Sequence, residues 1–143
     1  MKIDRAGIER LVPHAGAMCL LDAVIEWSAS TIACTSASPA ADHPLARHGR
    51  VPAIVATEYA AQATAVHGAL LEDAGPARAG MLATLVDVQL AGAAMPADGG
   101  ALSIRAELLG RSPAGCMYRF EVGTARTLIA SGRLTVVLAE QAR

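Results

Sequence analysis

Residues 52–72 read PAIVATEYAAQATAVHGALLE, and this stretch decides the fold. Pro52 suits the first position of a helix, and neither proline nor glycine follows until Gly68. The spacing therefore predicts one helix of about 20 residues and about 30 Å. Its apolar residues leave no continuous polar stripe, which is typical of a helix buried on nearly all sides. Such a helix needs a sheet curved around it.

Runs with strand character lie on both sides of this helix. They are residues 18–28 and 30–38 before it, and 81–95, 101–112, 116–125 and 127–140 after it. Apolar and polar residues alternate in the later runs, and turn sequences separate them at hairpin spacing. A short helix is expected at 3–12 and a loop at 39–51. This order predicts an α+β architecture, with an antiparallel β-sheet wrapped around a long central α-helix.

Composition limits the class of protein. The 143 residues are 53% hydrophobic and 17% charged, with a formal net charge of −1. This length predicts a single domain over residues 1–143, and the apolar surplus predicts an oligomeric interface. The chain has no basic block and only 3% aromatic residues, so nucleic-acid binding has no support.

Cysteine usage and hydropathy bear on the compartment. Cys19, Cys34 and Cys116 form neither a CxxC pair nor a Cys/His spacing that would hold a metal. We therefore expect reduced thiols in the core of a cytoplasmic protein and no metal site. No run approaches ~18 uninterrupted apolar residues, so no membrane span is expected, and the N-terminus lacks the apolar core of a signal peptide.

Glu58 is a carboxylate in the middle of the apolar helix. A helical side chain leans toward the helix N-terminus, so Glu58 is expected to point back at Pro52 and the preceding loop, which carries His43 and His48. Desolvation among Ala and Val favours a protonated carboxyl. Such a carboxyl beside a near-neutral imidazole suits an elimination, in which one group removes a proton and the other protonates a leaving hydroxyl.

These residues also admit simpler interpretations. Glu58 can form an ion pair with Arg47 or Arg50, and loop histidines are often solvated surface residues. His48 is an alternative to His43 as the catalytic histidine, because a glycine follows His48 directly, as in a flexible catalytic loop.

Other polar residues are expected to be structural. We expect His14 to be hydrogen-bonded beneath the helix and His67 to be a packed or surface residue. Asp22 is expected to cap or pin the first strand, and Tyr59 to lie in the core or at an interface.

Three segments stand out: LVPHAGAMCLLDAV (11–24), HPLARHGRVPA (43–53) and TEYAAQA (57–63). Together they resemble the FabZ-type 3-hydroxyacyl-acyl-carrier-protein dehydratases of the hotdog fold, in particular the branch associated with aryl polyene biosynthesis. LVPHAGAMCLLDAV (11–24) is similar to that family's Pro-His-Arg-x-Pro-x-Leu-Leu-x-Asp-Arg segment. HPLARHGRVPA (43–53) resembles its catalytic-histidine loop, and TEYAAQA (57–63) resembles its Glu-x-Met-Ala-Gln signature.

The resemblance implies a hydro-lyase that dehydrates a 3-hydroxyacyl thioester, carried on acyl carrier protein, to the trans-2-enoyl thioester in fatty acid or polyene-type synthesis. It implies His43 as general base and Glu58 as acid, with His48 as the alternative histidine. It also implies an active site shared between two subunits of a homodimer, a higher homo-oligomer or a hotdog heterodimer. No cofactor is expected.

Two features of the helix start fit this reaction. The unpaired N–H groups around Ala53 and Ile54 can stabilise the thioester oxygen as it gains enolate character. Gln62 lies one turn beyond Glu58 and can hold it by a hydrogen bond. Two other functions stay open: an acyl thioesterase in which Glu58 activates water, and a non-catalytic acyl-binding partner subunit.

Overall fold

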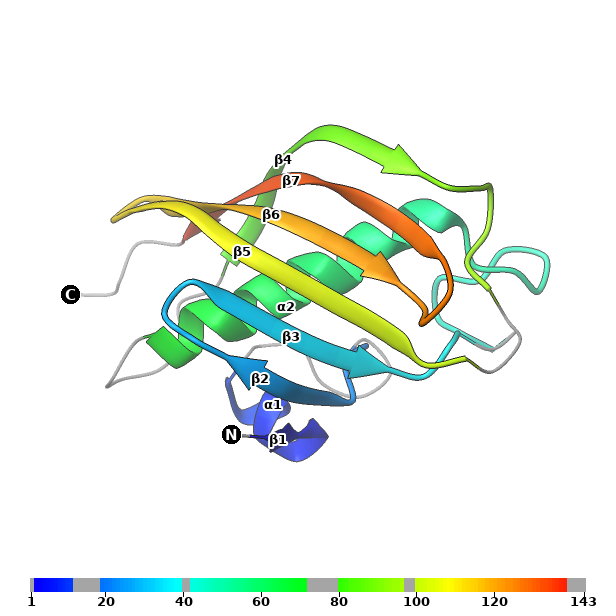
Figure 1. Ribbon diagram of the computed structural model, residues 1–143, viewed down its shortest axis with the longest axis horizontal. Helices are drawn as coiled ribbons and strands as arrows, with labels where there is room; N and C mark the ends of the chain where they lie inside the picture. Colours follow the sequence, from blue (N-terminus) through cyan, green and yellow to red (C-terminus); the bar gives the residue numbers. More distant parts are fainter. Residues whose placement is uncertain (1, 12–18, 40–41, 72–79, 97–99, 139–143) are drawn as a thin grey trace.

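The computed structural model describes residues 2–11, 19–39, 42–71, 80–96 and 100–138. The strands are β1 (Ile3–Asp4), β2 (Ala23–Trp27), β3 (Thr31–Ser36), β4 (Gly80–Leu90), β5 (Leu102–Ser112), β6 (Gly115–Gly123) and β7 (Leu128–Leu138). The helices are α1 (Arg5–Leu11), the 3-10 turn η2 (Ala53–Val55) and α2 (Ala56–Leu71). Among these residues the strands form one antiparallel sheet in the order β1-β2-β3-β5-β6-β7-β4, which runs along α2 (Figure 1).

The predicted α+β architecture is confirmed, and the differences lie at the ends of elements. Ile3 and Asp4 pair with β2 as a short strand, so the first helix begins at Arg5 instead of residue 3. Pro52 lies just before η2, and the regular α2 begins only at Ala56. The physical reason is a backbone pairing of residues 51–53 with 93–95, which holds the helix start in an extended-to-3-10 conformation.

Helix α2 is buried on the side that faces the sheet. It contacts β3, β5, β6 and β7, and the residues buried there include Tyr59, Ala63 and Val66. The predicted burial on nearly all sides is not reached within one chain, because the sheet and residues 19–22 leave one face of α2 uncovered. The residues Glu58, Ala61, Ala65 and Gly68 share the opposite face and stay partly exposed.

The last strand of the sheet carries exposed apolar side chains. Among the described residues β4 pairs only with β7, so its other edge is open (Figure 1). Leu85, Val86 and Leu90 on this strand are each about two-fifths exposed. This edge and the open face of α2 are the surfaces of the described fold that fit the predicted oligomeric interface.

The predicted core thiols are confirmed, since Cys19, Cys34 and Cys116 are all buried. No helix in the described part of the chain is long and apolar enough to cross a membrane.

Candidate active site

The loop before α2 ends in a tight hairpin. Arg47 and Arg50 exchange two backbone hydrogen bonds of 2.7 and 3.1 Å. His48 and Gly49 form the tip with φ of 53° and 75°, which are the positive values of a type I′ turn. His48 is exposed, and within the described ranges it forms neither a hydrogen bond nor an ion pair. His48 is therefore displayed to solvent at the hairpin tip.

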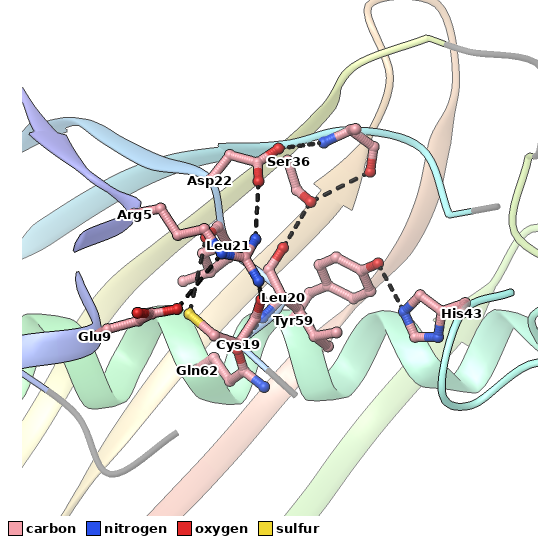
Figure 2. A network of polar contacts seen from close by, with 11 residues as sticks. Arg5, Glu9, Cys19, Leu20, Leu21, Asp22, Ser36, His43, Tyr59 and Gln62 are labelled. Atoms are coloured by element: carbon pink, nitrogen blue, oxygen red, sulfur yellow. Dashed lines mark hydrogen bonds and ion pairs between the residues drawn. The ribbon is translucent and has the colours of Figure 1, made fainter. Parts of the chain in front are cut away.

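His43 lies at the base of the same loop and is half-buried. Its Nε2 is 3.1 Å from the hydroxyl of Tyr59, and the two rings stack with centroids 6.2 Å apart. Figure 2 shows Tyr59 reaching from α2 toward this histidine. The sequence placed Tyr59 in the core or at an interface. Its side chain is indeed only 2% exposed, but it also holds the candidate catalytic histidine.

A backbone contact favours one tautomer of the neutral imidazole of His43. The N–H of Leu45 donates to His43 Nδ1 at 3.0 Å. Because a backbone N–H can only donate, Nδ1 must be the acceptor, and the neutral ring carries its proton on Nε2. That Nε2–H then donates to the Tyr59 oxygen.

Burial shifts the ionisation of both partners. Desolvation lowers the pKa of His43 below its ordinary value of 6.5, and the nearby carboxylate of Asp42 opposes this shift. Desolvation raises the pKa of Tyr59 to about 12, and the charge of Asp22 adds to the rise. At neutral pH the pair is therefore an uncharged imidazole and an uncharged phenol.

Glu58 is held by Gln62, as the sequence predicted. Gln62 Nε2 donates to Glu58 Oε1 at 3.2 Å. The Leu20 N–H donates to Gln62 Oε1 at 2.9 Å, so the amide oxygen must face Leu20 and the NH₂ group must face Glu58. Gln62 is buried, which keeps this orientation.

Residues 19–22 lie over α2 and join this cluster to the sheet. Ser36 Oγ donates to the Leu20 carbonyl at 2.7 Å. Asp22 accepts from the Ala37 N–H at 2.8 Å and from Arg5 Nη1 at 3.2 Å. Figure 2 shows these contacts next to Tyr59. Asp22 thus pins the segment before β2 to the end of β3.

The two candidate catalytic residues have different partners within one chain. The hydrogen bonds of His43 go to Tyr59 and Leu45, so Glu58 is not its partner here. Successive helical residues point about 100° apart, so Glu58 and Tyr59 face different sides of α2. The arginines of the hairpin (Arg47 and Arg50) form no ion pair with any described residue, so an ion pair between either of them and Glu58 is not seen in the part of the chain that the structure describes.

The helix start offers one of the two predicted oxyanion donors. The Ala53 N–H already donates to the Ala93 carbonyl at 3.0 Å, because residues 51–53 pair with 93–95, so this donor is occupied. The Ile54 N–H has no acceptor among the described residues, and the Ile54 side chain is 46% exposed. Ile54 is thus the donor that stays available.

A second histidine is fully buried on α2. His67 Nε2 donates to the Ser28 carbonyl at 2.8 Å, and the Tyr118 hydroxyl donates to Nδ1 at 2.7 Å. Burial lowers the pKa of His67. Of the two alternatives predicted for His67, a packed or a surface residue, the structure shows the packed one. The prediction for His14 falls outside the described residues. No group of His, Cys, Asp and Glu in the described ranges could hold a metal ion.

Comparison with known proteins places this geometry in a wider context. No match was found among curated proteins. A family model described as ApeP-like, ApeP dehydratase, matches residues 6–143. A chain of the dehydratase heterocomplex ApeI:P from Xenorhabdus doucetiae is similar, with TM-score 0.82, 25% identity, and coverage of 94% of this chain and 91% of that chain.

Two thioesterase structures share the architecture at lower identity. A variant of a Staphylococcus aureus thioesterase has TM-score 0.64 and 14% identity, covering 82% of this chain and 92% of that chain. A hypothetical thioesterase with coenzyme A from Streptococcus pneumoniae has TM-score 0.61 and 11% identity, covering 84% of this chain and 87% of that chain. Together these similarities confirm the hotdog fold.

Proposed function

Because the chain belongs to the ApeP-like dehydratase family, we propose that it removes water from a 3-hydroxyacyl thioester to give the trans-2-enoyl thioester. The acyl group is carried on acyl carrier protein, and the reaction serves fatty acid or polyene-type synthesis in the cytoplasm.

The supporting observation is the placement of two proton-active groups at the first turn of α2. The neutral imidazole of His43 is held by Tyr59, and the carboxyl group of Glu58, the preceding residue, is held by Gln62. Each group has its own buried positioning partner. This is the kind of support that acid–base catalysis needs, because reacting groups must keep their geometry.

The elimination needs three things of the site. The C2 proton must be removed, the C3 hydroxyl must leave as water, and the thioester oxygen must be stabilised while it carries charge. His43 and Glu58 are the proposed catalytic residues, and the open N–H of Ile54 is the proposed backbone donor. His48 is the less favoured histidine, because it lies at the exposed hairpin tip.

We propose that a second hotdog subunit completes the site. Within one chain His43 and Glu58 do not bond each other, and the face of α2 that carries Glu58 is left partly exposed. The similar chain comes from a dehydratase heterocomplex, which favours a heteromeric partner over a second copy of this chain.

The decisive experiment measures hydration of a 2-enoyl thioester by loss of its ultraviolet absorbance. The chain is assayed alone and in complex with a hotdog dehydratase subunit. His43→Ala and Glu58→Gln are each expected to lose about 10²–10⁴-fold in kcat, the usual contribution of an acid–base group. The control, His48→Ala, keeps the activity of the unmodified chain.

Other outcomes would identify the alternatives. Release of free thiol without enoyl turnover would make the protein a thioesterase. Full activity of a complex that carries both variants in this chain would make it a non-catalytic partner subunit, as would the absence of turnover in this chain beside tight binding to an active partner.

A further inference from the structure

The hairpin at the tip of the loop before α2 sets two arginines side by side. Arg47 and Arg50 exchange both of their backbone hydrogen bonds, so they form a directly opposed cross-strand pair. The side chains of such a pair leave the same face of a hairpin, with their Cβ atoms about 4.5–5.5 Å apart. Both arginines are exposed. Two guanidinium groups therefore extend from one face of this loop.

No carboxylate of the described residues balances this pair of charges, since Arg47 and Arg50 form no ion pair with any of them. By contrast, Arg5, Arg119 and Arg133 each contact a carboxylate oxygen, at 2.6 to 3.2 Å. Like charges that lie directly opposite each other destabilise their strand pair. The hairpin therefore holds two charges whose repulsion a bound anion would offset.

The arginine pair lies near the candidate catalytic histidine. Arg47 comes four residues after His43, so their Cα atoms are at most about 14 Å apart. A turn between these residues, in which the Ala46 N–H donates to the His43 carbonyl, shortens this distance. Figure 1 shows the loop at the end of the molecule where α2 begins. The arginines are thus placed to hold the anionic end of a molecule whose other end reaches His43.

We infer that Arg47 and Arg50 bind the phosphate of the phosphopantetheine arm that carries the acyl thioester. This inference rests on the proposed function and names the part of the substrate that the hairpin recognises. The phosphate and the sulfur are the two ends of such an arm, so a thioester placed at His43 leaves the phosphate at the outside of the loop. Arginine suits this role because its planar fork matches two phosphate oxygens and its charge is permanent.

The proposed contact is the same in the ground state and in the transition state. The phosphate takes no part in the elimination, so its binding does not change while the C–H and C–O bonds break. Loss of such a contact raises KM and leaves kcat unchanged. Because both arginines are exposed, salt is expected to screen the attraction. These signatures separate phosphate binding from a role of the loop in holding His43, whose loss would lower kcat.

Binding of two small ligands tests the site without any need for turnover. 4′-Phosphopantetheine and pantetheine differ only in the phosphate, and amide NMR of the protein follows each titration. At low salt the unmodified protein is expected to bind phosphopantetheine about 10-fold more tightly, within the range of two exposed ion pairs, with shifts at His48 and Gly49. Equal affinities for the two ligands would overturn the inference.

Paired substitutions assign the difference to the hairpin. Arg47→Ala combined with Arg50→Ala is expected to abolish it, so that both ligands bind alike. The matched control is Arg105→Ala combined with Arg111→Ala on β5, because these arginines are also exposed and form no ion pair with a described residue. The control is expected to keep the preference for phosphopantetheine. An equal loss in the control, or no loss in the hairpin variant, would refute the site.

A charge-preserving variant guards against a loss that comes from a distorted loop. Arg47→Lys combined with Arg50→Lys keeps both charges and is expected to retain most of the preference for phosphopantetheine. A loss as complete as that caused by alanine would contradict the inference, because two cations at the same place must still attract a phosphate.

Turnover of three enoyl thioesters identifies the source of the phosphate. The thioesters of coenzyme A and of acyl carrier protein both carry the phosphate of the arm, whereas the pantetheine thioester lacks it. The double alanine variant is expected to raise KM about 10-fold for the first two substrates only, with every kcat unchanged. A rise for the carrier-protein substrate alone would assign the arginines to the surface of the carrier and overturn the phosphate site, and a lowered kcat would assign them to the support of His43.

The failure of the proposed function has its own signature. An unmodified complex without any enoyl turnover would refute the proposed reaction but leave the ligand titrations valid. A preference for phosphopantetheine that depends on the hairpin would then still show that the protein holds the arm, as a thioesterase or an acyl-binding subunit would. The lack of that preference would refute the inference whatever the turnover.

Discussion

Tyr118→Phe tests how much a buried tyrosine–histidine hydrogen bond stabilises this fold. The substitution removes one hydroxyl group and keeps the ring, which packs in the core with the side chain 1% exposed. The lost bond runs from the Tyr118 hydroxyl to His67 Nδ1 over 2.7 Å, and His67 is 0% exposed. No water can therefore take the place of the hydroxyl without opening the core.

The magnitude follows from the acceptor that the substitution leaves behind. A buried polar group that loses its partner costs about 1–3 kcal/mol, whereas a hydrogen bond that water can replace contributes only about 0.5–1.5 kcal/mol. We expect Tyr118→Phe to lower the free energy of unfolding by about 2 kcal/mol, which for a chain of this size lowers Tm by roughly 4–8 °C.

Tyr59→Phe is the matched comparison, measured by urea unfolding and by thermal unfolding in the same buffer. The partner of Tyr59 is His43, which is only half-buried, so water can reach the ring after the hydroxyl is lost. We expect a loss below about 1 kcal/mol. The reasoning would be refuted if Tyr118→Phe were no less stable than Tyr59→Phe, because burial of the orphaned histidine is the stated cause of the difference.

Three further predictions concern pH, packing and assembly. Burial lowers the folded-state pKa of His67 below the ordinary value of 6.5, so the unfolded chain takes up a proton on this histidine at a higher pH than the folded chain does. The contribution of His67 to stability is therefore complete above pH 6.5, and below it the free energy of unfolding falls by up to about 1.4 kcal/mol per pH unit. Urea unfolding at pH 7.5 and 5.5 checks this, and His67→Gln is expected to show a flatter dependence on pH. Gly115→Ala is expected to destabilise the fold by more than about 2 kcal/mol, because the new Cβ would collide with the backbone of β7. Gly110→Ala, whose Cβ meets nothing within 4 Å, should be near neutral. Equal melting temperatures of the two variants would contradict this prediction. Leu85→Lys on the open edge of β4 is expected to weaken assembly of the protein, as measured by light scattering. Leu109→Lys on β5, where the side chain is similarly exposed, should leave assembly intact. If Leu109→Lys weakened assembly and Leu85→Lys did not, this edge would be excluded as the interface.

The fold was predictable from local sequence patterns. The errors of that prediction come from backbone pairing between residues far apart in the sequence. The helical run after Pro52 and the alternating strands follow from side-chain periodicity, which each segment carries by itself. The delayed start of α2 follows from the bond between Ala53 and Ala93, which lie forty residues apart. That pairing depends on how β4 leaves the sheet. It also explains why one of the two predicted oxyanion donors is already occupied.

In the candidate site, too, the local contacts were predictable from the sequence and the long-range contacts were not. The bond from Gln62 to Glu58 was predictable because residues four apart on a helix are neighbours, whatever the rest of the chain does. The bond from Tyr59 to His43 spans 16 residues and a folded loop, and no pattern in the sequence announces it. A motif therefore locates a histidine, but its chemical role depends on which groups face its two nitrogens. Here the Leu45 N–H donates to Nδ1 of His43, a contact of the folded loop that the motif does not encode.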